Sequence, residues 1–224
     1  FSLNRNKILE LFGDVGTYTL EGKTITGEVP DYTNAWFPGH AIDHVWDYNI
    51  LGIWQEHEAD EAAEYRLKPG DLKSEDVNND GQYDALTDKK FIGHSRPRVR
   101  MGLRNEFAIF RNLQASVFLR ADLGHIRAFN QGLRTGGVDT YDRRNTYKTP
   151  YWTPSNPIND FPSLTNTIAV YGGGISFYKP ASFVRIQDLT LSYSLPGEWT
   201  DRLMAQNIRF YGSVRNLYSF DKWP

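Results

Sequence analysis

A short run of oxygen-bearing side chains is the part of this sequence best suited to chemistry. The residues that carry these oxygens are Asp76, Asn78, Asp80, Gln82, Asp84 and Asp88. Up to Asp84 their spacing matches a calcium-binding loop, with Gly81 at the sharp turn and the Gln82 carbonyl oxygen as a ligand. A calcium ion takes about six to eight oxygens, which alternate residues supply by pointing inward. The run therefore predicts a structural calcium site.

The end of this loop departs from the calcium pattern. Position 12 of such a loop normally carries an acid, but here it is Thr87, and Asp88 comes directly after it. A slightly wider loop would still bring Asp88 to the ion. The alternative is an Asx-rich turn without a metal, because Asn, Asp and Gly form turns unaided. In both cases the loop would pin the backbone and would carry out no reaction.

The remaining groups of polar residues do not favour catalysis either. His40 and His44 have the spacing of zinc ligands on a helix, but Pro38 and Gly39 precede them and an extended segment comes next, which predicts solvated loop histidines. The acids of residues 56–64 are more typical of the wet face of a short helix than of a carboxylate pair for glycoside hydrolysis. The nucleophile-elbow, phosphate-loop and zinc-protease motifs are absent from the sequence. We therefore expect no catalytic residue and no enzyme.

Aromatic residues in the connecting segments are candidates for ligand contacts. We single out Tyr151 and Trp152, whose rings could stack on a sugar or on an apolar ligand. The alternative is packing within the loops or against a partner, since aromatic side chains anchor cores and interfaces as readily as ligands. The same choice applies to Trp36, Trp46 and Trp54.

The elements that position these groups are strands with one apolar and one polar face. Residues 98–123 predict two strands joined by a minimal turn at Arg111 and Asn112. Successive side chains of a strand point to opposite faces. One face carries the apolar residues Val99, Met101, Leu103, Phe107, Ile109, Leu113, Ala115, Val117, Leu119, Ala121 and Leu123. Each strand is long enough to cross a bilayer when tilted, which takes about 9 to 11 residues.

Two further strands repeat this pattern, at residues 183–195 and 207–218. In the first of them, Val184 and Ile186 are out of phase with the rest, which predicts either a bulge or a part of the strand that lies outside the membrane. The basic residues of the four strands would share the polar face, because a charge on a lipid-facing surface costs about 2 to 4 kcal/mol near the bilayer midplane. These residues are Arg98, Arg100, Arg104, Arg120, Arg209 and Arg215.

The connections between the strands differ greatly in length. Residues 111–112 and 196–206 are short, whereas residues 12–97 and 125–181 are long excursions. In an antiparallel series the short turns then fall at one rim and the long loops at the other, which is typical of outer-membrane barrels. Within the first excursion, the Ala- and Glu-rich residues 56–67 predict a helix.

Composition narrows the class of protein. The 224 residues include no cysteine, which excludes disulfides and thiolate metal sites. A net charge of -2 without a basic run gives no sign of nucleic-acid binding. No apolar run approaches the roughly 18 residues of a transmembrane helix. The chain lacks an initiator Met and opens within an expected strand at residues 1–9, so we expect a piece of a longer protein.

Several short motifs, taken in order, resemble the C-terminal part of SusC/RagA-type TonB-linked outer-membrane proteins. They are GIWQ (52–55), KPGDLK (68–73), DVNNDG (76–81), FIG (91–93), WTPSNP (152–157), SFVRIQDLTLSYSLP (182–196) and VRNLYSF (214–220). An acidic helix is expected between the first two. The motifs occur in the family's order and cover most of the chain, which makes their combination specific.

The resemblance implies an all-β fold, namely an antiparallel transmembrane β-barrel segment of a larger barrel of about 22 strands, with long extracellular loops and one short helix. It implies a TonB-dependent nutrient importer of Bacteroidetes-type outer membranes that takes up oligosaccharides or peptides with a SusD-like lipoprotein. Further partners would be outer-membrane lipid and the TonB–ExbB–ExbD complex, acting through an N-terminal plug that this chain lacks, as it lacks the final strand. The family's calcium-like loop usually places its last acid one position before Asp88.

On this interpretation, the chain is the C-terminal part of the receptor barrel over its whole length. The expected segments are a long extracellular loop at 12–97 that contains the calcium-like loop 76–88, a spanning hairpin at 98–124, a second extracellular loop at 125–181 and a second spanning hairpin at 182–218.

Two other hypotheses stay open at this point. One is a secreted soluble β-sandwich that binds carbohydrate and is stabilised by calcium. The other is a calcium-dependent glycosidase. The property that separates them from a barrel segment is the environment of the apolar strand face, which a sandwich seals inside a protein core.

Overall fold

A computed structural model describes residues 1–129, 133, 150–172 and 174–223 of the chain. The remaining residues of the predicted loop 125–181 lie outside the described residues. The chain divides into two compact units, which we treat separately. The sheet unit comprises residues 1–5, 96–126 and 180–224, and the loop unit comprises residues 6–95 and 127–179.

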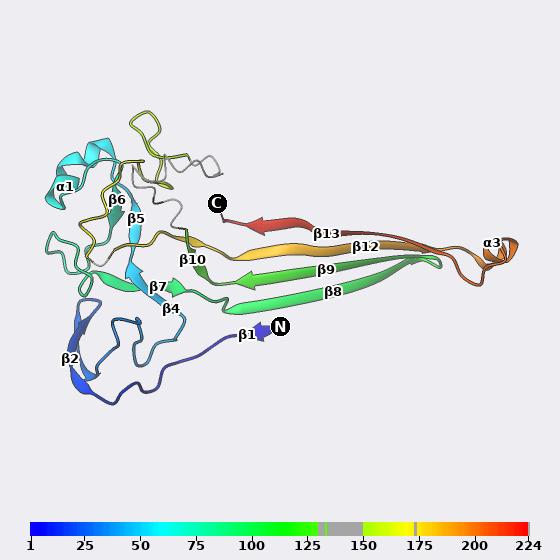
Figure 1. Ribbon diagram of the computed structural model, residues 1–224, viewed down its shortest axis with the longest axis horizontal. Coiled ribbons are helices and arrows are strands. Elements are labelled where there is room, and N and C mark those ends of the chain that lie inside the picture. Colours follow the sequence, from blue (N-terminus) through cyan, green and yellow to red (C-terminus); the bar gives the residue numbers. More distant parts are fainter. Residues whose placement is uncertain (130–132, 134–149, 173, 224) are drawn as a thin grey trace. The chain divides into compact units, whose positions relative to one another are not determined.

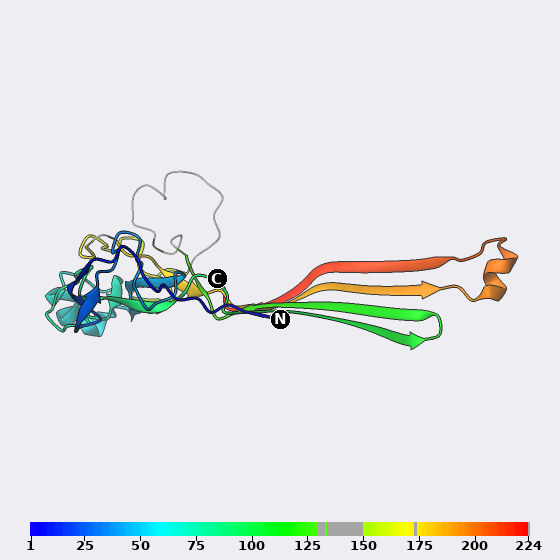
Figure 2. The ribbon, with the colours of Figure 1, turned by 90° about the horizontal axis from the view of Figure 1, so that it is seen from below.

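The sheet unit is built on one five-stranded antiparallel sheet with the order β1-β8-β9-β12-β13. The four long strands run side by side in both ribbon views (Figures 1 and 2). The strands are β1 (Ser2–Leu3), β8 (Val99–Phe110), β9 (Leu113–Leu123), β12 (Phe183–Ser194) and β13 (Arg209–Asp221). The two long hairpins and the turn at 111–112 agree with the sequence prediction, whereas the strand expected at residues 1–9 is confined to β1.

Hydrogen-bonding register lines up like residues across the strands. Leu103 pairs with Leu119, and a second apolar row runs from Val117 through Leu189 to Val214. Between such rows lie polar ones, such as Glu106, Ser116, Thr190 and Ser213. Because every strand alternates with a period of two, one matched row fixes the face of all the others. The predicted separation into an apolar and a polar face is therefore confirmed in these rows, with Asn105 opposite Val117 and Phe118 opposite Arg104 as exceptions.

The apolar face has no protein layer over it within the described residues of the sheet unit. Leu103 is 54% exposed and Leu191 is 51% exposed. The described residues of this unit form a single sheet and no second sheet packs on it. A β-sandwich would bury these side chains between two sheets about 10 Å apart. The apolar side chains of this sheet are therefore not buried in the protein core that the sandwich hypothesis requires.

The predicted bulge in the third long strand is present. Register shifts between Ile186 and Asp188 against both neighbours, β9 and β13. The shift brings Ile186 opposite Leu119 and Val184 opposite Ala121, so both out-of-phase residues rejoin the apolar rows. A bulge inserts one unpaired residue into a strand and thereby restores the facing of the residues beyond it.

The connection at residues 196–206 contains an element that the sequence analysis missed. Helix α3 (Gly197–Arg202) begins directly after Pro196, whose fixed φ suits a helix start. It is six residues long, too short for a clear 3.6-residue pattern in the sequence. No helix in the described part of the chain has the length and apolar character needed to cross a membrane.

The loop unit consists of short paired strands and one short helical segment. Its elements are β2 (Val15–Leu20), β3 (Lys23–Glu28), β4 (His44–Tyr48), β5 (Ile50–Ile53), η1 (Glu56–Glu58), α1 (Ala59–Glu64), β6 (Leu72–Ser74) and β7 (Lys89–His94). The pairs are β2 with β3, β4 with β7, and β5 with β6. Strands β10 (Ile126–Ala128) and β11 (Tyr178–Pro180) also pair with each other. The helix predicted at 56–67 is thus shorter and begins as a 3₁₀ turn.

Aromatic and aliphatic side chains form the core of the loop unit. Tyr48, Ile53 and Leu72 are at most 1% exposed. Tyr83 stacks on Tyr65 and on Tyr171 with ring centroids 4.8 and 4.9 Å apart. Each large side chain removed from water contributes about 1.5 to 3 kcal/mol. These contacts join segments from both long excursions and explain how such long connections are ordered.

Gly70 illustrates how closely the two excursions pack. Its φ of +92° lies in the left-handed region, and a Cβ atom there would lie 2.6 Å from a Trp152 ring carbon and 2.8 Å from Ser163 Cβ. The backbone also closes on this point, because the Ser163 amide donates to the Gly70 carbonyl at 2.8 Å. Only glycine meets both requirements without strain.

Replacing Gly70 with alanine should destabilise the loop unit by about 2 to 4 kcal/mol, because left-handed strain adds to overpacking. The matched control is Gly27→Ala, where a Cβ would meet nothing within 4 Å and φ is not positive. Hydrogen exchange of the β5 and β6 amides measures the change. Equal protection in the two variants would contradict this packing.

Candidate functional site

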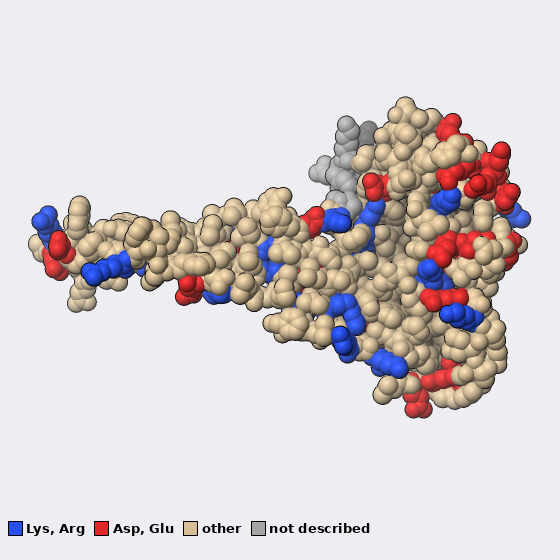
Figure 3. Space-filling view, turned by 180° about the vertical axis from the view of Figure 1, so that it is seen from behind, with Lys and Arg blue, Asp and Glu red and all other residues tan. Residues whose placement is uncertain are grey.

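The polar face of the sheet carries a shallow hollow of about 320 Å³. Arg209 donates to Ser192 Oγ at 2.7 Å and to Gln114 Oε1 at 3.2 Å, which links three strands. The other residues that line the hollow are Glu106, Ala108, Ser116 and Thr190, together with Phe107 and Ala115 from the adjoining apolar row. In the space-filling view, Lys and Arg are blue and Asp and Glu are red (Figure 3). The hollow combines hydroxyl and amide groups with the charged side chains of Glu106 and Arg209.

The predicted calcium loop has the backbone shape of such a loop. Asp76 Oδ1 accepts from the amides of Asn79 at 2.6 Å and Asp80 at 3.3 Å, and its Oδ2 accepts from the Gly81 amide at 2.9 Å. Asn79 and Gly81 both have positive φ, 57° and 77°. Gly81 thus makes the sharp turn that a calcium loop needs at this position.

Asp88 joins this loop, as the wider-loop hypothesis requires. Its side chain is fully buried and accepts from the Val77 amide at 3.0 Å, the Asp84 amide at 2.8 Å and the Thr87 hydroxyl at 3.0 Å. The carboxylates of Asp76, Asp80, Asp84 and Asp88 form no ion pair with Lys or Arg among the described residues. Backbone and side-chain donors alone stabilise these charges.

The same carboxylates do not yet converge on one point. Within the described ranges, no group of three or more acidic, histidine or cysteine side chains is arranged to hold a metal ion. Asn78 Oδ1, Asp80 Oδ1 and Asp84 Oδ1 instead accept from nearby amides of their own loop. The loop has the turn and the oxygen-rich sequence for calcium, and binding would require these side chains to turn inward.

The two predicted ligand-binding aromatics differ in their surroundings. Trp152 is 6% exposed, packs in the loop-unit core and donates its indole N–H to Gln55 Oε1 at 3.0 Å. Tyr151 is 41% exposed. The structure thus places Trp152 where it packs against the protein itself, and leaves Tyr151 accessible to a ligand.

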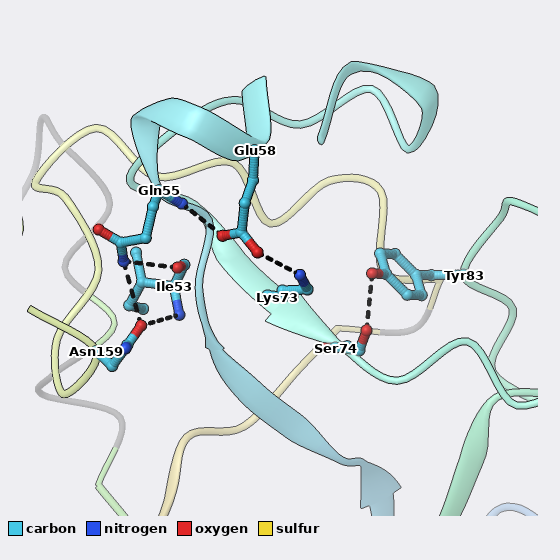
Figure 4. Close-up of polar contacts among 7 residues, drawn as sticks. All are labelled: Ile53, Gln55, Glu58, Lys73, Ser74, Tyr83 and Asn159. Atoms are coloured by element: carbon cyan, nitrogen blue, oxygen red, sulfur yellow. Dashed lines mark hydrogen bonds and ion pairs between the residues drawn. The ribbon is translucent and has the colours of Figure 1, made fainter. Parts of the chain in front are cut away.

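A polar network that the sequence did not indicate ties the helical segment to the second excursion (Figure 4). Gln55 Nε2 donates to the Ile53 carbonyl at 2.8 Å and to Asn159 Oδ1 at 3.2 Å. Lys73 donates to Glu58 Oε1 at 2.6 Å, and this bond lowers the pKa of the Glu58 carboxyl. Asn159 carries no signal in the sequence, because its role depends on a chain segment about 100 residues away.

Buried titratable groups in the loop unit are held by hydrogen bonds. Asp71 is fully buried, and burial raises its pKa. Its carboxylate accepts from the Thr167 amide at 2.7 Å and the Lys68 amide at 3.0 Å, which oppose that shift. Burial also raises the pKa of the Tyr65 hydroxyl, which donates to Asp76 Oδ2 at 3.2 Å. These groups hold loops in place and are not arranged for proton transfer.

The prediction that His40 and His44 are solvated loop histidines is wrong. Both rings are half-buried, and the His40 ring stacks on Phe91 with centroids 3.9 Å apart. The sequence signal failed because the partner ring comes from β7, far along the chain. β7 also brings His94, whose ring centroid lies 4.3 Å from that of His44.

No family model matches the sequence. The TonB-dependent receptor P3 of Formosa agariphila is 25% identical over 238 residues, an alignment that covers 100% of this chain and 22% of the relative. The chain therefore spans about a fifth of the length of this receptor. A curated receptor matches along the whole chain, so the similarity is not confined to one motif.

Solved structures are similar to the chain in fold. The RagAB peptide importer in its open-open state has a TM-score of 0.58 at 19% identity, covering 99% of this chain and 22% of that chain. The RagAB peptide transporter has a TM-score of 0.56 at 21% identity, covering 99% and 23%. The chain is thus similar along its whole length to a segment of a TonB-dependent receptor, and its fold is similar to that of the RagAB structures. Both similarities support the resemblance that the sequence motifs carry.

Within the receptor, Trp152 and Tyr151 should respond differently to truncation. Trp152→Ala should destabilise the loop unit by about 3 to 5 kcal/mol, because it removes a buried ring and leaves a cavity. Tyr151→Ala is the matched control and should change stability by less than about 0.5 kcal/mol. Limited proteolysis of the 150–172 segment measures the difference. Equal susceptibility of both variants would contradict the core role of Trp152.

Proposed function

We propose that this segment forms part of the wall and outer loops of a TonB-dependent nutrient importer. The observation that carries the proposal is the row-by-row alternation of apolar and polar residues across the sheet, with the apolar rows exposed. A wall between hydrocarbon and a water-filled lumen needs this arrangement on every strand. The sheet would belong to a closed barrel of about 22 strands, which removes its free edges.

The topology supports an orientation for the wall. The turn at 111–112 and the α3 connection lie at the same end of the four long strands (Figure 1). At their other ends, the strands continue along the chain into the segments of the loop unit. Short turns of outer-membrane barrels face the periplasm and long loops face outward. We assign residues 12–97 and 125–181 to the outer surface on this basis.

The partners of the whole receptor derive from the same assignment. The similar solved structures are described as RagAB peptide importers. We propose uptake of peptides or oligosaccharides with a SusD-like surface lipoprotein that meets the outer loops, and Tyr151 as an accessible contact for the cargo. The TonB–ExbB–ExbD complex would supply energy through a plug, as the resemblance implies. Outer-membrane lipid would cover the apolar rows.

We also propose a structural calcium ion in the loop 76–88. Supporting it are the left-handed turns at Asn79 and Gly81 and the buried Asp88, together with four carboxylates that lack a cationic partner among the described residues. The ligands would be Asp76, Asn78, Asp80, the carbonyl of Gln82, Asp84 and Asp88. The ion would join the two ends of the loop and would take no part in transport.

A charge on the apolar face tests the importer proposal. Leu103→Arg should cost about 2 to 4 kcal/mol in the membrane, so the receptor should assemble poorly. Ser116→Arg places the same charge on the polar face and serves as the matched control. Assembly is measured as the amount of folded, heat-modifiable receptor in outer membranes. Import is measured as growth on peptides or oligosaccharides of a receptor-deficient strain, with and without the receptor. Normal assembly of Leu103→Arg would contradict the lipid-facing assignment, and normal growth without the receptor would contradict import.

Removal of divalent ions tests the calcium proposal. A chelator should accelerate protease cleavage within residues 76–88 by at least about tenfold, because an ion that binds only the folded loop stabilises it by mass action. Adding calcium should restore protection in the wild-type receptor and in Glu61→Ala, an exposed acid outside the loop. Asp76→Ala should not recover. A cleavage rate that changes neither with the chelator nor with added calcium would rule out the ion.

A further inference from the structure

Three of the five histidines of the chain gather at one end of the β4–β7 pair. His44 and His94 face each other across the two strands in register, with ring centroids 4.3 Å apart. His40 precedes β4, and its backbone amide donates to the Phe37 carbonyl at 3.0 Å, which turns the chain back toward β7. The Phe91 ring supports the His40 ring from one side. This histidine cluster lies outside the loop 76–88 and outside the strand wall.

The two nearest imidazole nitrogens in the cluster face each other. His40 Nδ1 and His44 Nδ1 are 3.3 Å apart. A hydrogen bond from a ring N–H is typically about 2.9 to 3.0 Å. Two nitrogens that bind one tetrahedral metal ion at about 2.0 to 2.1 Å each are separated by about 3.3 to 3.4 Å. The observed separation, which also allows a long N–H···N hydrogen bond, therefore equals the spacing of two nitrogens on one metal ion.

The surroundings favour a cation at this place. Asp43 is 3% exposed, accepts from Asn6 Nδ2 at 2.7 Å, and lies 3.5 Å from His94 Nδ1. Glu21 approaches from the β2–β3 hairpin and accepts from the Phe91 amide at 2.9 Å.

Neutral imidazole is the form that binds metal ions. Acid should therefore weaken metal binding at this cluster, because protons compete for the same Nδ1 atoms.

We propose that His40 and His44 bind a divalent ion of the zinc, nickel and copper group through their Nδ1 atoms. Imidazole prefers these ions, whereas calcium prefers oxygen ligands, so this site is chemically distinct from the loop 76–88. No third acidic or histidine side chain is already in ligand position among the described residues, so water fills the other positions of the ion. His94 packs on the His44 ring and is a positioning residue.

The test uses the full receptor, purified in detergent and stripped with a chelator. Nickel is titrated by calorimetry, and copper is added for electron paramagnetic resonance. The wild type should show one ion with two imidazole nitrogens, and His40→Gln and His44→Gln should each weaken binding at least about tenfold. Glutamine keeps much of the side-chain volume, and hydrogen exchange of β4 and β7 confirms that the variants fold.

His57→Gln is the matched control, because His57 is exposed on η1 and should leave binding unchanged. Asp76→Ala should also leave binding unchanged, which separates this ion from calcium. His94→Gln should weaken binding less than the two ligand variants while keeping two nitrogens in the copper spectrum. Binding that is equal in wild type, His40→Gln and His44→Gln, or that is absent from the folded wild type, would overturn the site.

Discussion

The alternation of side chains along a strand is the constraint on which the sheet unit depends. In a bilayer it is stricter than in water, because each charge moved to the lipid face costs about 2 to 4 kcal/mol. The register meets it on every long strand, with Leu103 opposite Leu119 and Thr190 opposite Ser213. In the proposed barrel wall, a slip of one residue would turn Arg104 and Arg120 toward hydrocarbon and would expose leucines to the lumen. A bilayer would thus select one register out of many that backbone hydrogen bonds alone would permit.

The loop unit is ordered by contacts within its own core. Its long connections contain no cysteine and hence no disulfide. Order comes instead from contacts between distant segments, such as the Trp152 indole with Gln55 and the Asp71 carboxylate with the Thr167 amide. A buried polar group that loses its partner costs about 1 to 3 kcal/mol, so these bonds specify one arrangement of the two excursions. This explains why aromatic and polar residues of both excursions share one core.

The sequence predicted the features that depend on local period and failed where distant segments meet. The long strands, the turn at 111–112 and the bulge before Asp188 all derive from alternation within a single segment. The burial of Trp152 and the stacking of His40 on Phe91 do not, because their partners lie 97 and 51 residues away in the chain. Helix α3 was missed for another reason, since six residues are too few to show a helical period. The alternation of side chains within one segment thus predicts the long strands well, but it does not predict contacts between distant segments of the loop unit.

The two proposed ion sites extend the same argument about the loop unit. The entropic cost of bringing the ends of a flexible loop together grows with the logarithm of its length. A bound ion that joins two points of a long loop offsets part of this cost. The loop 76–88 would close on itself through oxygen ligands, whereas an ion on His40 and His44 would tie the turn before β4 to the first residue of that strand through nitrogen ligands. Because the two donor sets prefer different ions, removing one proposed ion should leave the other bound. The contribution of each ion to the order of the loop unit can therefore be measured separately.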